Sequence, residues 1–160
     1  MESKSNMSAK TIIKKLTKQK KTLSVAESIT AGGLAAAITD IAGSSKVFLG
    51  GLIVYSDEAK IKQLNIAKSL LAEYTAVSEQ VVIEMARNVR KKFDSDFAIA
   101  TTGVAGPKPA YGQKPGTVWL AIADRKSTLS IPLSLKGDRE SVRNAAIESA
   151  IATFSRILSS

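Results

Sequence analysis

Hydrophobic residues recur along the chain with two periods, and these periods predict its helices and strands. Apolar positions three or four residues apart indicate amphipathic helices, whereas short unbroken apolar runs indicate buried strands. The predicted helices cover residues 8–20, 31–40, 57–64, 78–93 and 139–158. The predicted strands cover residues 22–26, 47–55, 96–101, 117–123 and 128–133, the last two as a hairpin.

The order of these elements predicts an α/β fold, namely a three-layer α/β/α single domain with a mixed sheet. We expect residues 47–55 to form a central strand, because they are apolar and rich in β-branched side chains. Residues 103–115 hold three Gly and three Pro and are expected to form a loop. The predicted helix-capping residues are Ser8, Ser56 and Asp138.

The length of 160 residues suits one domain, which we expect over residues 10–160. Residues 1–9 are polar and precede the first apolar period, so they are expected to form a disordered basic tail. The N-terminus has no apolar core of a signal peptide, and no apolar run is long enough to span a membrane. We therefore expect a cytoplasmic protein with no membrane partner.

The net charge of +9 is unevenly distributed along the chain. Residues 1–21 hold seven Lys and one Glu, and the rest of the chain is only mildly basic. Aromatic residues, which stack on bases in many nucleic-acid binders, make up only 5%. This pattern favours the solvated face of an amphipathic helix over a surface for nucleic acid or anionic lipid, so no nucleic-acid partner is expected.

The chain contains no Cys and no His. This excludes disulfides, a thiolate nucleophile, a Cys/His zinc site and a Ser-His-Asp triad. The glycine-rich phosphate loops GxGxxG and GxxxxGK[ST] and the GxSxG nucleophile motif are also absent. Acid–base chemistry must therefore come from Lys, Tyr, Asp, Glu or the backbone.

Three polar segments follow predicted strands: residues 27–30, 55–60 and 101–103. Ligands of open α/β sheets bind beyond the carboxyl ends of the strands, so these segments predict a site. Ser28 is a candidate nucleophile, and Lys60 is a candidate base if its pKa is lowered. Free N–H groups at the start of the next helix would suit an oxyanion. From composition alone, Ser28 also fits a helix cap and Lys60 a solvated surface charge.

Several motifs occur in a fixed order and together resemble the CinA carboxy-terminal-domain family. They are AESITAG (26–32), GSS (43–45), FLGG (48–51), YSDEAK (55–60), AVSE (76–79), TGVAGP (102–107), KPGTV (114–118) and GDRE with Arg143 (137–143). The resemblance covers residues 10–158, and it departs from the family pattern at Ala31 and in the loop 108–113, where the family has more Gly.

The resemblance implies a nicotinamide-nucleotide amidohydrolase, which converts nicotinamide mononucleotide to nicotinic acid mononucleotide and ammonia without a cofactor. It implies Ser28 as nucleophile and Lys60 as base, supported by Tyr55 and Thr102. Either Arg139 or Arg143 would complete the site or hold the substrate phosphate. The expected substrate-binding residues are Thr30, Gly32, Gly103, Gly106, Arg139 and Arg143.

An alternative interpretation is a non-catalytic nucleotide-binding protein, or one associated with competence or DNA damage. In either case the expected partner is a small nucleotide, together with a second copy of the chain in a homodimer.

Overall fold

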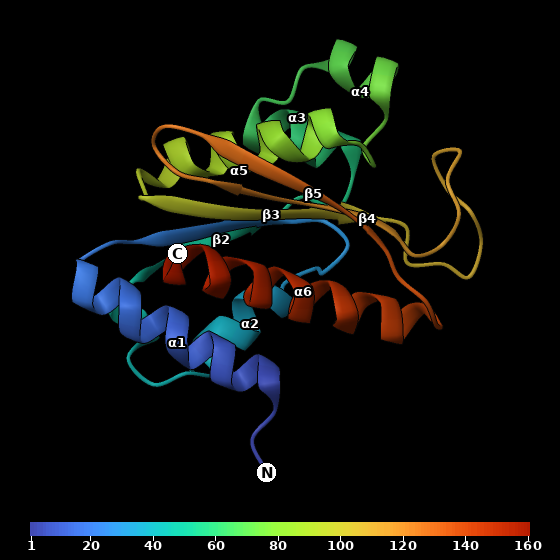
Figure 1. Cartoon of the computed structure of the whole chain (residues 1–160). Coiled ribbons are helices and arrows are strands. Elements are labelled where there is room, and N and C mark those ends of the chain that lie inside the picture. Colours follow the sequence, from blue (N-terminus) through green and yellow to red (C-terminus); the bar gives the residue numbers. More distant parts are fainter.

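The computed structural model describes residues 1–160, which form a five-stranded sheet between two layers of helices (Figure 1). The strands are β1 (Leu23–Glu27), β2 (Phe48–Ile53), β3 (Phe97–Gly103), β4 (Thr117–Ala123) and β5 (Thr128–Ser134). The α-helices are α1 (Lys4–Gln19), α2 (Gly33–Thr39), α3 (Asp57–Leu64), α4 (Lys68–Tyr74), α5 (Glu79–Phe93) and α6 (Arg139–Ser159), and a 3-10 turn, η1, covers Ser44–Lys46. The predicted three-layer α/β/α architecture is confirmed.

The sheet is mixed, with strand order β2-β1-β3-β4-β5. Strand β1 is parallel to both of its neighbours, β2 and β3, whereas β3–β4 and β4–β5 are antiparallel. The carboxyl ends of β1, β2 and β3 therefore lie side by side, at the same end of the sheet along the strand direction. The polar segments 27–30, 55–60 and 101–103, which follow or end these strands, are thus neighbours in space.

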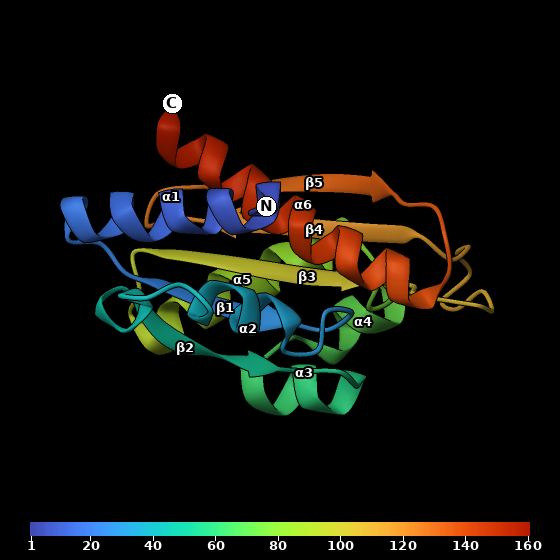
Figure 2. The same cartoon turned by 90° about the horizontal axis from the view of Figure 1, so that it is seen from below.

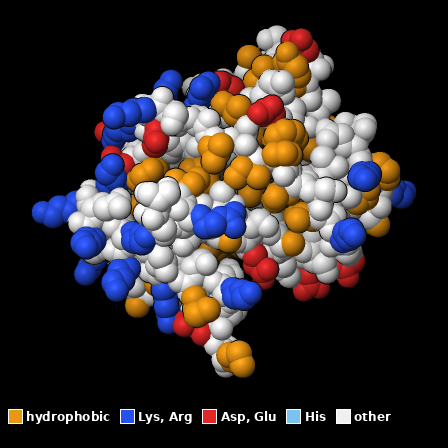
Figure 3. Space-filling model, viewed as in Figure 1, with side chains coloured by type: hydrophobic (Ala, Val, Ile, Leu, Met, Phe, Trp, Pro, Cys, Tyr) orange, Lys and Arg blue, Asp and Glu red, His pale blue; other side chains and the backbone are white.

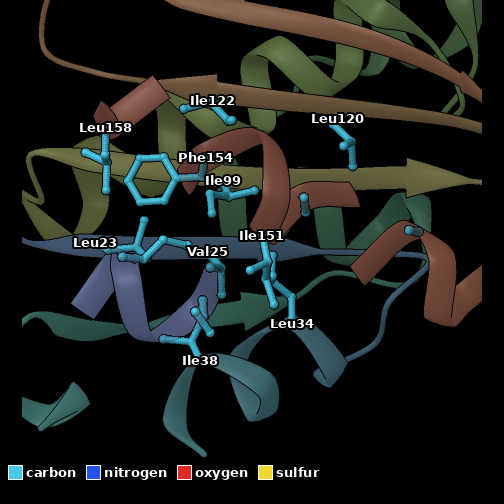
Figure 4. Close-up of a cluster of buried hydrophobic side chains, with 14 of the residues drawn as sticks. Leu23, Val25, Leu34, Ile38, Ile99, Leu120, Ile122, Ile151, Phe154 and Leu158 are labelled. Carbon is cyan, nitrogen blue, oxygen red and sulfur yellow. The ribbon is translucent and has the colours of Figure 1, made fainter. Parts of the chain in front are cut away.

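Each face of the sheet has its own hydrophobic core. Helices α1, α2 and α6 cover one face, as seen from below in Figure 2, and α3, α4 and α5 cover the other (Figure 1). Figure 4 shows the first core, in which Phe154 and Ile151 of α6 contact Ile99 and Val25 of the central strands. The second core joins α5 to the small Ala side chains of β3 and β4. The two cores fix the sheet from both sides and so hold the strand ends in place.

The helix ends confirm two of the three predicted caps. The side chain of Ser56 accepts a hydrogen bond from the Ala59 N–H, and that of Asp138 accepts one from the Ser141 N–H. The prediction for Ser8 is wrong, because α1 begins at Lys4 and is capped by Ser3.

The prediction that residues 1–9 form a disordered tail is also wrong, because the first helix begins within this segment. Residues 4–9 belong to α1, and Ala9 is buried. The polar residues before Ala9 are compatible with a helix because only one side of an amphipathic helix needs to be apolar.

Two further predictions differ from the structure. Helix α4 was not expected, since it is only seven residues long and its N-cap residue, Ala67, has no side chain that can cap it. Residues 48–53 form an edge strand rather than a central one, because β2 pairs with β1 alone.

The basic residues gather away from the strand ends that carry the polar segments. In Figure 3 most Lys and Arg side chains lie on the left, over the end of α1 and the turn between β4 and β5. None of the helices combines the length and apolar character needed to cross a bilayer.

Candidate functional site

Ser28 is the first residue after β1 and lies at the bottom of a pocket. Its backbone N–H donates to the carbonyl of Thr101 at 3.0 Å, which extends the pairing of β1 with β3 by one residue. This bond fixes the direction of the side chain, which is only 8% exposed. Ser28 is therefore held by the sheet rather than by a mobile loop, and it does not cap α2, whose N-cap is Gly32.

Lys60 reaches Ser28 from the first turns of α3. Its Nζ lies 3.0 Å from Ser28 Oγ and 2.9 Å from the carbonyl oxygen of Val54. The side chain is 1% exposed and forms no ion pair. Lys60 is thus not a solvated surface charge, and the structure brings the two predicted chemical groups into direct contact.

Burial changes the acid–base behaviour of Lys60. Removing the ammonium from water disfavours its charged form and lowers the pKa of Lys60 to about 8, whereas the negative charge of Asp57 acts in the opposite direction. About a tenth of Lys60 is therefore neutral at pH 7, far more than for an exposed lysine, and the neutral form is the one that a general base requires.

The pocket above Ser28 and Lys60 has a volume of about 160 Å³. It is walled by the ends of β1 and β3, the segment before α5, the loop after β3 and the first residue of α6. The lining residues are Ser28, Ile29, Tyr55, Lys60, Ala76, Val77, Thr102, Gly103, Val104, Ala105, Gly106, Lys108, Ala110, Tyr111 and Arg139.

A buried network lies directly behind Ser28 and is centred on Glu27. The Glu27 carboxylate accepts from the Thr30 hydroxyl at 2.6 Å and from the N–H groups of Leu34 and Ala35 at 2.8 and 3.0 Å. The Thr30 hydroxyl also contacts the Thr101 hydroxyl at 2.8 Å. Glu27 therefore occupies the start of α2, and the expectation that these N–H groups face an oxyanion is wrong.

Other backbone donors border the pocket instead. The N–H groups of Ile29, Ala105 and Gly106 have no hydrogen-bond acceptor within the chain. Ile29 directly follows Ser28, so its N–H is the donor closest in sequence to the serine. The turn after β1 thus leaves a backbone N–H free beside the serine, while Glu27 takes up those at the start of α2.

Tyr55 and Arg139 meet at the mouth of the pocket. The Arg139 guanidinium donates to the Tyr55 hydroxyl at 3.0 Å and to the carbonyl of Gly106 at 2.7 Å. Gly106 has a φ of +91°, and a Cβ there would approach Pro115 to 2.9 Å, so this turn needs glycine. Arg139 therefore connects the segment after β2 with the loop after β3.

The remaining predicted site residues divide into two groups. Gly103 lines the pocket, as does Thr102, whose hydroxyl donates to the carbonyl of Ala76 at 2.7 Å and so anchors the pocket wall. Thr30 and Gly32 lie outside the pocket, where Thr30 bonds to Glu27.

The structure also separates Arg143 from Arg139. Arg143 donates to the carbonyls of Ile29 and Thr30 at 3.1 and 3.3 Å and does not line the pocket. Of the two arginines, only Arg139 faces the pocket.

Two residues of the site were not predicted from the sequence. They are Tyr111, which lines the pocket, and Glu27, which supports the turn that carries Ser28. Tyr111 lies in the loop 103–115, and partial burial together with nearby Asp57 raises its pKa. Its neighbour Lys108 adds a positive charge to the same wall. The motif around Ser28 contained the signal for Glu27, since a carboxylate at the end of a buried strand needs donors.

Comparisons with known proteins agree with this architecture. The profile of the family described as CinA C-terminal domain matches residues 5–158. A CinA-like protein of Endomicrobium trichonymphae is 42% identical over 144 residues, and one of Geotalea daltonii is 48% identical over 123 residues. These matches cover 89% and 76% of this chain but 34% and 30% of the relatives, so the chain spans about a third of their length.

Two solved structures align with this chain over nearly the whole length of both chains. The competence damage-inducible protein A (ComA) of Klebsiella pneumoniae is 34% identical with a TM-score of 0.95, and the alignment covers 98% of both chains. The competence/damage inducible protein CihA of Agrobacterium tumefaciens is 31% identical with a TM-score of 0.94, covering 100% of this chain and 98% of that one.

Proposed function

The chain belongs to the CinA family, whose C-terminal domain it matches, and we propose that its pocket hydrolyses the carboxamide of nicotinamide mononucleotide. The products are nicotinic acid mononucleotide and ammonia. The observation that carries this proposal is the 3.0 Å contact between the buried Nζ of Lys60 and Oγ of Ser28. A hydroxyl beside an amine of lowered pKa is the arrangement that nucleophilic catalysis needs when no histidine is present.

The first step is the attack of Ser28. A neutral Lys60 has two N–H bonds and one lone pair. The carbonyl of Val54 accepts one N–H at 2.9 Å, which limits rotation of the amine and lets the lone pair face Ser28 Oγ. As Oγ bonds to the carboxamide carbon, the Ser28 proton moves to Nζ.

The second step releases ammonia. The negative charge that develops on the amide oxygen is stabilised by the free N–H of Ile29 and its neighbours in the pocket. The Lys60 ammonium returns its proton to the amide nitrogen, and the C–N bond breaks. Water, deprotonated by Lys60, then attacks the ester on Ser28, which restores the hydroxyl and releases the carboxylic acid.

The charges around the pocket fit a nucleotide phosphate. Lys108 and Arg139 line it, and both residues are exposed, whereas Ser28 is buried. Arg139 is held in position by Gly106 and Tyr55, so its guanidinium is oriented before a ligand arrives. We assign the substrate phosphate to these two cations and the carboxamide to Ser28.

Ammonia release from nicotinamide mononucleotide by the purified protein tests this proposal. Nicotinamide riboside, which lacks the phosphate, and free nicotinamide serve as matched substrates and should react with much lower kcat/KM. Lys60→Met, which keeps a long unbranched side chain, should abolish ammonia release without unfolding the protein. Absence of ammonia from every pyridine nucleotide overturns the enzymatic proposal and favours a non-catalytic nucleotide-binding role.

A further inference from the structure

The loop between β3 and β4 contains a tight hairpin that brings Tyr111 to the pocket. Ala110 and Gln113 exchange two backbone hydrogen bonds, at 3.1 and 2.9 Å. The side-chain amide of Gln113 donates to the carbonyl of Val77 at 2.5 Å, which ties the hairpin to the pocket wall before α5. The loop projects beyond the strands in Figure 1, but this bond fixes its hairpin against the pocket.

The backbone at the tip of the hairpin is strained. Tyr111 has a φ of +52° and Gly112 a φ of +70°. A two-residue turn of this kind favours Asn, Asp or Gly at both positions, and a bulky residue there is an outlier. Such strain persists mainly at functional sites. The needs of the turn therefore do not explain the tyrosine, whereas a function of its side chain would.

The Tyr111 side chain is free to receive a ligand. It lines the pocket and is 47% exposed, and its hydroxyl forms no hydrogen bond within the chain. Tyr55 is the other aromatic residue that lines the pocket, and its hydroxyl is already held by Arg139 at 3.0 Å. Tyr111 therefore offers the one aromatic ring of the pocket that no other side chain holds in place.

The charges of the pocket walls show what this ring would bind. The lining residues include three that carry cationic groups, Lys60, Lys108 and Arg139, but no Asp or Glu. The ring of nicotinamide mononucleotide is itself positively charged, because its nitrogen is bonded to the ribose. Burying this cation without compensation costs free energy, and the face of a phenol ring attracts a cation. An aromatic face is thus the compensating group that the pocket walls provide.

We propose that Tyr111 is a specificity-determining residue whose phenol face binds the positively charged pyridinium ring of the substrate. The inference rests on the proposed function, from which it takes the substrate. It places the ring between the carboxamide at Ser28 and the phosphate at Lys108 and Arg139. The pocket then prefers a cationic ring to a neutral ring of the same shape.

A pair of ligands that differ in one ring atom tests this preference. Benzamide riboside monophosphate keeps the carboxamide, ribose and phosphate of nicotinamide mononucleotide, but a carbon replaces the ring nitrogen and the ring is neutral. Isothermal titration calorimetry compares the two ligands in the Ser28→Ala background, which should hydrolyse neither. Nicotinamide mononucleotide is expected to bind about tenfold more tightly.

Two substitutions of Tyr111 separate its ring from its hydroxyl. Tyr111→Phe keeps the ring and should retain most of the preference. Tyr111→Asn removes the ring but suits a positive φ, so the chain should stay folded while the preference falls below about twofold. The matched control is Tyr74→Asn, at a tyrosine of α4 that is 38% exposed and does not line the pocket, and it should leave the preference unchanged.

The ratio of the two affinities is the readout, because a general loss of binding leaves it constant. Equal affinities in the presence of Tyr111 would overturn the proposal, as would a preference that persists in Tyr111→Asn. A preference that Tyr111→Phe loses completely would assign the effect to the hydroxyl and also overturn it. Circular dichroism melting curves show whether each variant is folded.

Failure of this inference and failure of the proposed function give different results. If the wild-type chain releases ammonia and Tyr111→Asn keeps the preference, the reaction stands and the role of Tyr111 falls. If Tyr111→Asn loses the preference but the wild-type chain releases no ammonia, ring binding stands and the reaction falls. If neither ligand binds, both proposals fall.

Discussion

Glu27 and Ser28 are neighbours in the sequence, but they belong to different regions of the molecule. Glu27 faces α2, and its carboxylate accepts three hydrogen bonds from buried donors. Ser28 faces α3, and its hydroxyl contacts only Lys60. We call the first region the support network and the second the reactive pair.

The comparison shows how the two regions differ in energy and chemistry. Every donor around Glu27 is satisfied, which stabilises the turn that carries Ser28. The reactive pair gains no comparable stability, because a buried lysine without an anionic partner loses hydration. Changes in the support network should therefore alter stability, and changes in the reactive pair should alter activity.

Removing the reactive pair should give the largest effect. Ser28→Ala is expected to lower kcat by on the order of 10⁴-fold or more, and the double variant with Lys60→Met should be little worse than either single one. Thermal melting should show no loss of stability in either variant. Retention of most of the activity by Ser28→Ala would contradict the serine mechanism.

Breaking the support network should have the opposite signature. Glu27→Ala leaves the N–H groups of Leu34 and Ala35 without an acceptor and leaves the Thr30 hydroxyl with Thr101 as its only partner, so it should lower the free energy of unfolding by about 3 kcal/mol. Glu27→Gln keeps an acceptor oxygen and the shape of the side chain, so its loss should be about 1 kcal/mol. Urea denaturation measures the free energy of unfolding of both variants. If Glu27→Ala were as stable as the wild type, the support network would not stabilise the fold, and the distinction between the two regions would be lost.

Substitutions of the two arginines of α6 should have effects of intermediate size, one on activity and the other on stability. Arg139→Ala should raise KM about 10- to 100-fold with a smaller change in kcat, because it removes a cation from the pocket. Arg143→Ala should instead cost about 1–2 kcal/mol of stability, since it contacts only the backbone carbonyls of Ile29 and Thr30. A collapse of kcat at constant KM in Arg139→Ala would show that this residue acts on the transition state.

The smallest effect concerns the pH dependence of the reactive pair. Since the proposed base is neutral Lys60, kcat/KM should rise as the pH passes through about 8 and fall below it. Asp57 favours the protonated amine, so Asp57→Asn should lower the pKa of Lys60 and move this limb to lower pH. Activity on the acidic side of the limb then rises, by about tenfold for each pKa unit. A pH profile that is unchanged or moves to higher pH would contradict this role of Asp57.

Local interactions explain which parts of the fold could be predicted from the sequence. Ser56 and Asp138 cap helices through bonds to residues three positions away, so the sequence alone reveals them. The edge position of β2 depends on which strands pair, which is not encoded within residues 48–53. The apolar composition of this strand is that of a central strand, and it therefore does not reveal the position at the edge.

The candidate site shows the same limit. The positions after β1 and β2 were predictable, because the carboxyl ends of parallel strands meet. The burial of Lys60 and its contact with Ser28 depend on how α3 packs, and residue types carry no such information. Arg139 and Arg143 lie about one turn apart on α6, and only the packing of that helix decides which one faces the pocket.

The burial of Lys60 also has a consequence for the temperature dependence of the proposed reaction. Deprotonation of an amine absorbs much more heat than deprotonation of a carboxylic acid. Warming therefore lowers the pKa of Lys60 and increases its neutral fraction at a fixed pH. Below the pKa of about 8, heat should speed the reaction both by activating the chemical step and by supplying more of the base, whereas well above that pH only the first contribution remains.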